Sequence, residues 1–586
     1  MTDAAPAELD KLLKAPRAAR GRAPALLLAV AFLFVPLAAF LLLPICLAGG
    51  SGFVHEGAPS VYWFGRVLGN EMLMRQLLNG VALASATTLL CFVLAAPLAV
   101  VRARCRFRGQ GLLSVALLVP LILPPFVGAL SIERLLSRFG VLNMVLEKLG
   151  LVAIGPGQLP PDWLAGGFAG VMVMQALHLF PIVYLNASAA LANIDPAHVQ
   201  AARNLGAGPV RTFFRVTLPL MRPGLFAGGT IVFIWSFTDI GTPLILKVRD
   251  LLPVTLFGEL TGHAYTGRTF SLVFIMLAGA LTMYAMGKFV FGRRIDAGSS
   301  KATAQDELRK LGPLGTGLAW LGFGVVLFLA ILPHVGVVLY AFADKWGSTI
   351  LPSRYTTRHM TGVLTSQDTY QSMLNSLQYA GVSTGLDLAL GGLAAWLIVR
   401  SRVVGRRCLD SLVMLPLAVP GVILAAGYVA MTAPGSWLEE IGPDGRPFAI
   451  LVIAYAVRRL PFAVRGVSAG LEQVPESLEE AARNLGAGRA KTIWRITVPL
   501  IAANIIAAGV LTFAFAMLEV SDSLILAQRP GDYPITKQIY ESFVTGTGES
   551  QNVAAALGVY GMVLLGGTMA LASALLGKRL GAIFRA

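Results

Sequence analysis

Ionisable side chains lie inside long apolar stretches of this 586-residue sequence, where burying a charge is costly. Such residues are candidates for the lining of a translocation path: His178, Asp239, Arg458, Arg459, Glu519 and Asp522. Asp239 in WSFTDIGTPLIL and Glu519 in FAMLEVSDSLIL occupy equivalent positions, 280 residues apart. Both carboxylates could instead face extracytoplasmic water and cap the segment that follows. Arg458, which aligns with His178, could attract an anionic cargo or an anion-chelated metal, or form a structural ion pair with Glu519.

Enzyme motifs are missing from the sequence. The phosphate-binding pattern G-x-x-x-x-G-K-[ST] does not occur, and the Gly-Lys pairs at 287–288 and 577–578 are followed by Phe and Arg. There is no His-Glu-x-x-His, no serine elbow and no metal-ligand cluster among six dispersed histidines. The four cysteines show no C-x-x-C spacing. We therefore expect neither catalysis, nor a bound metal, nor any cofactor in this chain.

The composition is typical of a membrane protein. Hydrophobic residues make up 56% of the chain and charged residues 13%, the mean hydropathy is +0.71 and the formal net charge is +16. Soluble domains carry roughly 25% charged residues, so a soluble enzyme, a disordered protein and a nucleic-acid-binding protein are excluded. The excess of Lys and Arg indicates cytoplasmic loops, because positive residues concentrate on that side of a membrane.

Twelve apolar blocks are long enough to cross a bilayer, for which about 20 residues are needed. The first half has blocks at 24–48, 76–101, 111–132, 165–190, 222–246 and 270–292, and the second at 314–342, 375–399, 409–432, 447–469, 501–527 and 552–577. Arginines follow the second block of each half, which places these loops and both termini in the cytoplasm. We predict an all-α integral membrane protein divided into a tail at 1–23, transmembrane domains at 24–295 and 314–586, and a cytoplasmic connector at 296–313.

The second half of the sequence repeats the first. AARNLGAG occurs at 201–208 and again at 481–488, and the agreement continues downstream to Pro219 and Pro499. The third block of each half also carries two prolines four residues apart. Because each half contains an even number of spans, the two copies have the same orientation and form parallel six-helix repeats.

The repeated segment lies in a polar loop between the fourth and fifth blocks, at 192–221 and 471–500. Pro475 and the acidic residues after it start a helix, which should stop at Gly486 or Gly488 because glycine adopts the left-handed C-terminal conformation easily. A second short helix is expected to run to Pro499. A single copy could be a generic amphipathic interfacial helix, but two copies with matched spacing favour a common function.

These loops resemble the EAA loop of ATP-binding-cassette importer permeases, whose pattern is Glu-Ala-Ala, three residues, Gly, nine residues and Ile-x-Leu-Pro. The second copy matches with Glu480, Ala481, Ala482, Gly486, Ile496, Val498 and Pro499, and the first with Gln200, Ala201, Ala202, Gly206, Val216, Leu218 and Pro219. Val498 replaces the usual Leu, and Gln200 replaces the usual Glu. Four further loop residues are shared by the two copies: Arg203, Gly208, Arg483 and Gly488.

The resemblance implies a type I ABC importer permease fold, with both pore-forming halves in one multi-pass chain of the inner (cytoplasmic) membrane. It implies as partners the lipid bilayer, an extracytoplasmic solute-binding protein and two copies of a cytoplasmic ATPase, but no nucleic acid. The ATPase copies would bind ATP and Mg and receive the coupling loops. Because Gln200 lacks the carboxylate of Glu480, the two ATPase contacts should be unequal in strength.

A cargo is suggested by a further resemblance. A fused two-half chain with an arginine-rich fourth span in its second half, here AYAVRRLPFAVRG, is similar to the ferric-iron permease group. Groups that carry 2-aminoethylphosphonate, thiamine, sulfate or polyamines are related closely enough to compete. The rival class is a self-contained secondary transporter, which also often has twelve spans in two parallel halves. That class gives no reason for duplicated EAA loops.

Overall fold

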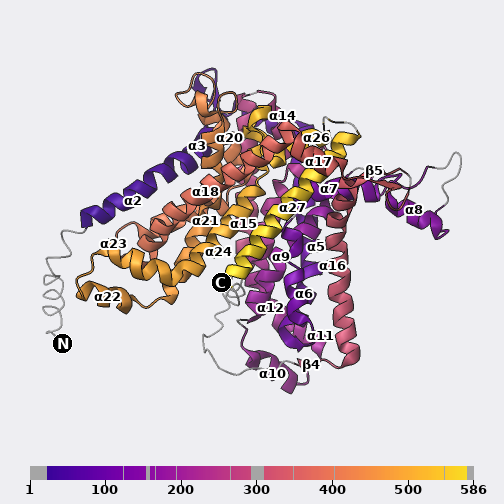
Figure 1. The fold of residues 1–586 in the computed structure, drawn as a ribbon, viewed down its shortest axis with the longest axis horizontal. Helices are drawn as coiled ribbons and strands as arrows, with labels where there is room; N and C mark the ends of the chain where they lie inside the picture. The colour runs from indigo at the N-terminus through magenta and orange to yellow at the C-terminus, as the bar shows by residue number, and fades with distance from the viewer. Residues whose placement is uncertain are drawn as a thin grey trace.

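The computed structural model describes residues 23–122, 124–152, 159–164, 167–192, 194–263, 265–291, 309–347, 349–401, 403–544, 546 and 548–576. In these residues the protein is helical apart from three two-stranded pairs, which confirms the predicted fold class. Long helices run between the two ends of the molecule, and short helices lie across both ends (Figure 1). The two termini, which were predicted to be cytoplasmic, fall outside the described residues.

The helices of the first half follow one another in this order: α2 (Ala23–Leu37), the π-helical η2 (Ala38–Leu42), α3 (Leu43–Ser51), α4 (Tyr62–Leu68), α5 (Glu71–Arg104), α6 (Gln110–Ala116), the 3-10 turn η3 (Val119–Ile122), α7 (Pro125–Leu136), α8 (Val141–Lys148), α9 (Phe168–Ala192), α10 (Pro196–Asn204), α11 (Pro209–Thr212), the π-helical η4 (Phe213–Thr217), α12 (Leu218–Phe237), α13 (Gly241–Ile245), α14 (Leu252–Thr261) and α15 (Gly267–Phe291). Polar side chains cap the starts of α5 and α10. The Asn70 side chain accepts a hydrogen bond from the backbone of Leu73 and begins α5 in this way.

The second half repeats this order with α16 (Pro313–Ala341), α17 (Arg358–Thr365), α18 (Gln367–Arg400), α19 (Arg406–Met414), η5 (Leu415–Leu417), α20 (Gly421–Met431), η6 (Glu439–Ile441), α21 (Phe448–Gln473), α22 (Glu476–Asn484), α23 (Arg489–Thr492), the π-helical η7 (Ile493–Thr497), α24 (Val498–Met517), α25 (Ser521–Leu526), η8 (Pro530–Asp532), α26 (Ile535–Val544) and α27 (Glu549–Leu576). Within each half the second, fourth and fifth long helices pack together: α5, α9 and α12, and correspondingly α18, α21 and α24.

Three short strand pairs lie outside the helices. Two are antiparallel: β1 (Val54–His55) with β2 (Ala58–Pro59), and β5 (Ala343–Lys345) with β6 (Arg354–Tyr355). The third is parallel and joins β3 (Cys105–Arg106), which follows α5, to β4 (Arg309–Lys310), which precedes α16. It attaches the end of the predicted connector to the first half. Most of that connector lies outside the described residues, so the domain boundary at 296–313 stays a prediction.

The predicted spans correspond to helices, although some of them are not single straight helices. In the described part of the chain, eight helices are long and apolar enough to cross a membrane, or ten if each of two bent pairs is one span. The bent pairs are the third spans, and the one in the second half bends by 103° at Pro420. The two remaining blocks correspond to α27 and to α21, which carries three arginines.

The first long helix of each half lies between the two halves. The indigo α3 packs on both α20 and α15, and the Tyr428 hydroxyl on α20 donates to the carbonyl of Phe40 at 2.7 Å (Figure 1). In the same way α16 packs against α7, where the Ser131 hydroxyl donates to the carbonyl of Pro333 at 2.8 Å. Gly427 allows the close contact of α20 with α3, because a Cβ there would lie 2.4 Å from the Pro44 oxygen. The first long helix of each half therefore packs against the other half, α3 on α20 and α16 on α7.

The fifth span of each half ends earlier than predicted. The blocks at 222–246 and 501–527 are not continuous helices, because α12 ends at Phe237 and α24 ends at Met517. Asp239 and Glu519 lie in the two breaks. The Asp239 carboxylate accepts hydrogen bonds from the backbone N–H groups of Gly241 and Thr242, which begin α13. Local capping therefore ends one helix and starts the next.

The second helix of each repeated loop does not end at the proline, contrary to the prediction for Pro499. It is the start of a longer helix that continues through a π-helical turn into the span, over Val210–Phe237 and Arg489–Met517. Pro219 and Pro499 lie directly after these π turns, in the first turn of α12 and α24. Proline lacks an N–H donor, and the wider turn before it accommodates the missing hydrogen bond without breaking the helix.

Candidate functional site

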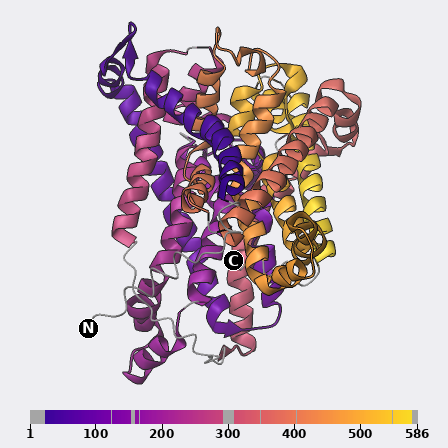
Figure 2. The same cartoon turned by 90° about the vertical axis from the view of Figure 1, so that its left-hand side faces the viewer.

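The two repeated loops lie at the same end of the molecule, where α10 and α22 are visible at the bottom and lower left of Figure 1, and Figure 2 shows them there from a second direction. Each first helix ends where predicted. Gly206 and Gly486 have positive φ values of 78° and 86° and close the helices with backbone hydrogen bonds to Arg203 and Arg483. The helix therefore stops at Gly486 and not at Gly488.

Substitution of Gly486 by alanine should loosen the second loop. The left-handed conformation costs a residue with a Cβ roughly 1–2 kcal/mol, so amide exchange over α22 and α23 should accelerate by about tenfold. Gly488 is a matched control, because its φ is −65° and no atom lies within 4 Å of a Cβ placed there. Equal exchange rates in Gly486→Ala and Gly488→Ala proteins, measured by mass spectrometry, would contradict this account.

Leucines are almost fully exposed at the tips of both loops. Leu205 is 88% exposed and Leu485 89%, and they occupy the same position of the repeated AARNLGAG segment. Glu480 is also exposed and forms no hydrogen bond or ion pair within the described part of the chain. The two projecting loops therefore present equivalent apolar side chains to solvent.

The second loop is held by Arg400 at the end of α18. Its guanidinium donates to the carbonyls of Leu471 and Val474 at 2.7 and 2.5 Å. It also lies 3.4 Å from the carboxylate of Glu479, which in turn accepts a hydrogen bond from Thr497 at 3.1 Å. Arg400 and Glu479 are both buried. Arg400 was predicted only as one of the cytoplasmic arginines, and Glu479, which adjoins the EAA motif, was not predicted as a site residue.

The first loop has a differently charged version of this attachment. The corresponding Arg104 at the end of α5 donates to the hydroxyl of Thr217, the counterpart of Thr497. The position of Glu479 is taken by Val199, which is buried and apolar. The duplicated loops therefore share a backbone shape but differ in charge at their base.

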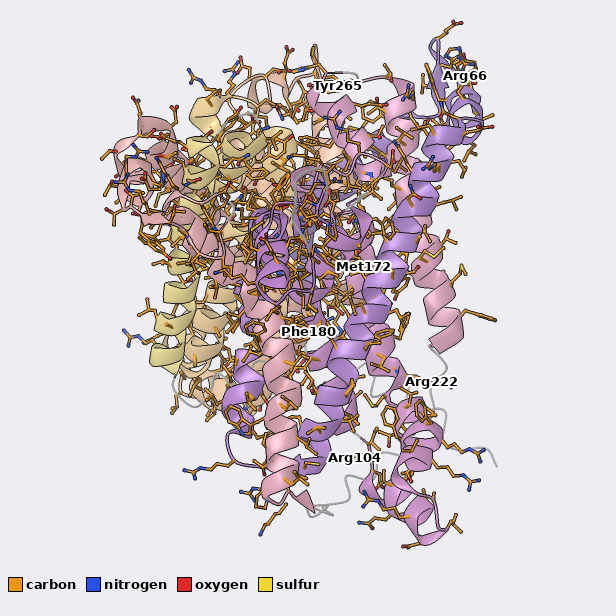
Figure 3. The ribbon with its side chains drawn as sticks, turned by 90° about the vertical axis from the view of Figure 1, so that its right-hand side faces the viewer. Arg66, Arg104, Met172, Phe180, Arg222 and Tyr265 are labelled. Atoms are coloured by element: carbon orange, nitrogen blue, oxygen red, sulfur yellow. The ribbon has the colours of Figure 1, made fainter. Side chains whose placement is uncertain are left out.

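A cavity of about 170 Å³ lies between the two halves. Its walls come from α9, α12 and the broken third span of the first half, and from the same elements of the second half. Figure 3 shows Met172 and Phe180 on α9 between one end, marked by Arg66 and Tyr265, and the opposite end, marked by Arg104 and Arg222. The α9 residues of the cavity lie between Met172 and Phe180 in sequence. The cavity is therefore within the membrane-spanning part.

Five of the six predicted path residues line this cavity: His178, Asp239, Arg458, Arg459 and Glu519. The structure thus brings together side chains that are up to 341 positions apart, between His178 and Glu519. Asp522, the sixth candidate, is fully buried behind the wall and is not among the lining residues. Prolines of both broken third spans, including Pro124 and Pro420, complete the lining.

An ion-pair cluster occupies the second-half wall. Arg458 Nη1 lies 2.7 Å from Glu519 Oε1 and 3.4 Å from Asp522 Oδ2, and Arg459 Nη2 contacts Glu519 Oε2. Glu519 is only 2% exposed, so it does not face extracytoplasmic water as one interpretation of the sequence proposed. The alternative of a structural ion pair with Arg458 is confirmed. Two arginines neutralise two carboxylates here, as buried charges require.

In the first-half wall, the equivalent positions make different contacts. Asp239 Oδ2 accepts a hydrogen bond from Gln175 Nε2 at 2.9 Å, and Gln175 Oε1 accepts one from the Ser236 hydroxyl. His178 Nδ1 lies 2.9 Å from the carbonyl of Pro120, to which it donates. In the described part of the chain no cation forms an ion pair with Asp239.

The end opposite the repeated loops is closed by contacts between the halves. Phe257 on α14 and Tyr540 on α26 pack edge to face, with ring centroids 5.7 Å apart, and both helices lie at the top of Figure 1. His263 and Asp444 lie 2.9 Å apart in the adjoining loops. Burial, and to a lesser extent the charge of Asp444, raises the pKa of Tyr265 to about 12, so this phenol stays neutral at physiological pH.

A helical membrane protein made of two parallel repeats, with a cavity between them and paired projecting loops at one end, has the architecture of a solute permease. The chain belongs to the family described as the binding-protein-dependent transport system inner membrane component, whose model matches it twice, at residues 93–295 and 387–585. It is therefore a multi-pass inner-membrane channel subunit and not a catalytic enzyme. The double match confirms the predicted pair of fused halves.

Several relatives are named for the transport of a metal. The chain is 29% identical to the ferric transport system permease protein FbpB of Actinobacillus pleuropneumoniae, over 78% of this chain and 65% of that protein. It is 27% identical to the putative ferric transport system permease protein FbpB 1 of Haemophilus influenzae, over 79% and 71%. It is 35% identical to the molybdenum transport system permease protein ModB of Escherichia coli, over 31% of this chain and 82% of that protein. The chain thus spans less than two thirds of the first of these relatives.

Proposed function

We propose that this protein is the membrane-spanning subunit of an ATP-driven, binding-protein-dependent importer. The observation that carries the proposal is the pair of projecting loops, whose Leu205 and Leu485 stay exposed among the residues that the structure describes. Two copies of a cytoplasmic ATPase, which bind ATP and Mg, would cover these leucines. An extracytoplasmic solute-binding protein would dock at the opposite end, and both chain termini would be cytoplasmic.

Each loop is connected to the cavity by one helix. The helix over Arg489–Met517 has 29 residues, a length of about 43 Å, and ends two residues before Glu519. The helix over Val210–Phe237 ends in the same way before Asp239. A loop that moves with its ATPase would therefore tilt a rigid rod whose far end lines the cavity. Closure of the ATPase dimer on ATP would separate the outer contacts, such as Phe257 with Tyr540, and open the cavity outward.

We propose ferric iron as the cargo, because two relatives that match most of this chain are named as ferric permeases. The 35% identity of one half to a molybdenum permease indicates that sequence similarity follows the helical architecture more closely than the cargo. Importers of 2-aminoethylphosphonate, thiamine, sulfate or polyamines are the alternatives within the class. Uptake of radiolabelled Fe³⁺ with the cognate binding protein tests the choice.

Substitution of Leu205 or Leu485 by aspartate should remove the ATPase from the purified complex. Both side chains are solvent-exposed in this chain, so the variants should fold normally, and a charge placed in a buried interface should reduce copurified ATPase at least tenfold. Leu149→Asp is the control, since Leu149 is 66% exposed and follows α8, outside the repeated loops. A self-contained secondary transporter would keep ion-driven uptake in all three variants, and that result would refute the proposal.

The same assay tests whether the ATPase contacts are unequal. The second loop carries Glu480, and Glu479 attaches it to Arg400 of the membrane helices. The first loop carries Gln200 and has the apolar Val199 at the position of Glu479. Leu485→Asp should therefore release more ATPase than Leu205→Asp. Exchange of the two side chains, by Glu480→Gln together with Gln200→Glu, should reduce this difference. Equal release before and after the exchange would refute the inequality.

A further inference from the structure

The duplicated carboxylates at the cavity have diverged in their pairing. By the repeat offset, Asp239 corresponds to Glu519, while His178 and Leu179 correspond to Arg458 and Arg459. Glu519 is held by both arginines. Asp239 has only neutral partners among the described residues, namely the Gln175 amide and the backbone N–H groups of Gly241 and Thr242. The second half thus has a carboxylate that is paired with two arginines. The first half has, at the same position, a carboxylate that no described cation contacts.

The charge of Asp239 faces the cavity. Asp239 is half-buried and is a lining residue, as are Gln175 and His178 beside it. On the opposite wall the charge of Arg458 is already balanced by Glu519 and Asp522. The two arginines of that wall are thus paired with Glu519 and Asp522, and among the described residues Asp239 is the one carboxylate lining the cavity that no cation contacts. An ionisable residue in a membrane interior is costly, which favours a function for it.

We propose that Asp239 is the cargo-contacting residue of the translocation path and that it attracts a positively charged cargo, whereas Glu519 is structural. This inference rests on the proposed importer function and deepens it by assigning the charge class of the cargo. A carboxylate oxygen is a hard ligand suited to a hard metal cation such as Fe³⁺. The Asp239 carboxylate would repel an oxyanion in the same cavity. A metal that is delivered together with an anion would therefore reach Asp239 as the free cation, without that anion.

The capping role of Asp239 must be separated from its charge. Asparagine keeps the oxygen that accepts from Gly241 and Thr242, because it is an equally good cap, and removes only the charge and the bond with Gln175. Gln175→Leu removes that same bond, of 2.9 Å, but leaves the carboxylate charged. Asp239→Glu restores the charge on a longer side chain. These three variants form a matched set.

The experiment uses the complete importer, with its ATPase and binding protein, in proteoliposomes, and measures uptake of radiolabelled Fe³⁺ and ATP hydrolysis separately. We expect Asp239→Asn to lower Fe³⁺ uptake about tenfold, the order expected for the loss of one charge contact away from bulk water, while ATP hydrolysis stays within twofold. Gln175→Leu should lower uptake several-fold less than Asp239→Asn, because it leaves the carboxylate of Asp239 in place. Asp239→Glu should recover most of the uptake.

Two results would overturn the inference: equal losses in Asp239→Asn and Gln175→Leu, which would make the role structural, or unchanged uptake in Asp239→Asn. Failure of the proposed cargo is a separate result, namely no Fe³⁺ uptake by the unmodified importer. In that case, uptake of a thiamine or polyamine cation that is lost in Asp239→Asn would support the role of Asp239. Uptake of molybdate or sulfate by the unmodified importer would refute it.

Discussion

Substitution of Glu519 by glutamine is expected to destabilise the folded permease by about 3–5 kcal/mol, the usual cost of removing one partner from a buried ion pair. Glu519 is 2% exposed and contacts both Arg458 and Arg459. Glutamine would leave the charge of Arg459 without its carboxylate partner. Arg458 would keep only Asp522, at 3.4 Å. Thermal unfolding of the detergent-purified protein measures the change.

Two further variants make this result specific. Asp239→Asn should lower stability far less, because no buried cation depends on Asp239 in the described part of the chain. Replacing Arg459 by leucine together with Glu519→Gln should recover part of the loss, since an apolar side chain leaves no uncompensated charge. Equal melting temperatures for Glu519→Gln and Asp239→Asn would contradict the division of the two carboxylates into a structural and a functional one.

Substitution of Arg400 by alanine should uncouple the second loop from the membrane helices. Arg400 is 7% exposed, and its loss leaves the buried carboxylate of Glu479 with only the Thr497 hydroxyl. Removal of one partner from such a pair costs about 3–5 kcal/mol, confined here to the base of α22 and α23. We expect ATP hydrolysis to continue while Fe³⁺ uptake falls, because the loop no longer moves its helix as a rigid body.

Arg104→Ala is the matched control for the first loop. It removes the bond to Thr217, but the buried carboxylate of Glu479 has no counterpart in this loop, because Val199 occupies that position. Its effect on uptake should therefore be several-fold smaller. Amide exchange over 476–497 and 196–217 reports the local opening of each loop directly. Equal acceleration in both variants would show that Glu479 does not strengthen the second attachment.

The sequence could predict features that depend on neighbouring residues. The helix end at Gly486 follows from one residue that adopts positive φ easily, and the repeated loops follow from AARNLGAG in two places. The breaks before Asp239 and Glu519 were missed, because the apolar residues continue through them and only the capping contacts end the helix. The continuation of the helix past Pro499 was missed because a π turn leaves no distinct residue pattern.

The sequence by itself determined that this is an all-helical membrane protein of two parallel repeats, with paired loops of one shape. These properties arise from apolar length, periodic repetition and local backbone preference, which neighbouring residues set. Only the tertiary structure decided that Glu519 is neutralised by Arg458 and Arg459 while Asp239 is not. It also decided that the first helices cross between the halves. Pairing of charges depends on distances between helices, and residues far apart in the chain set those distances.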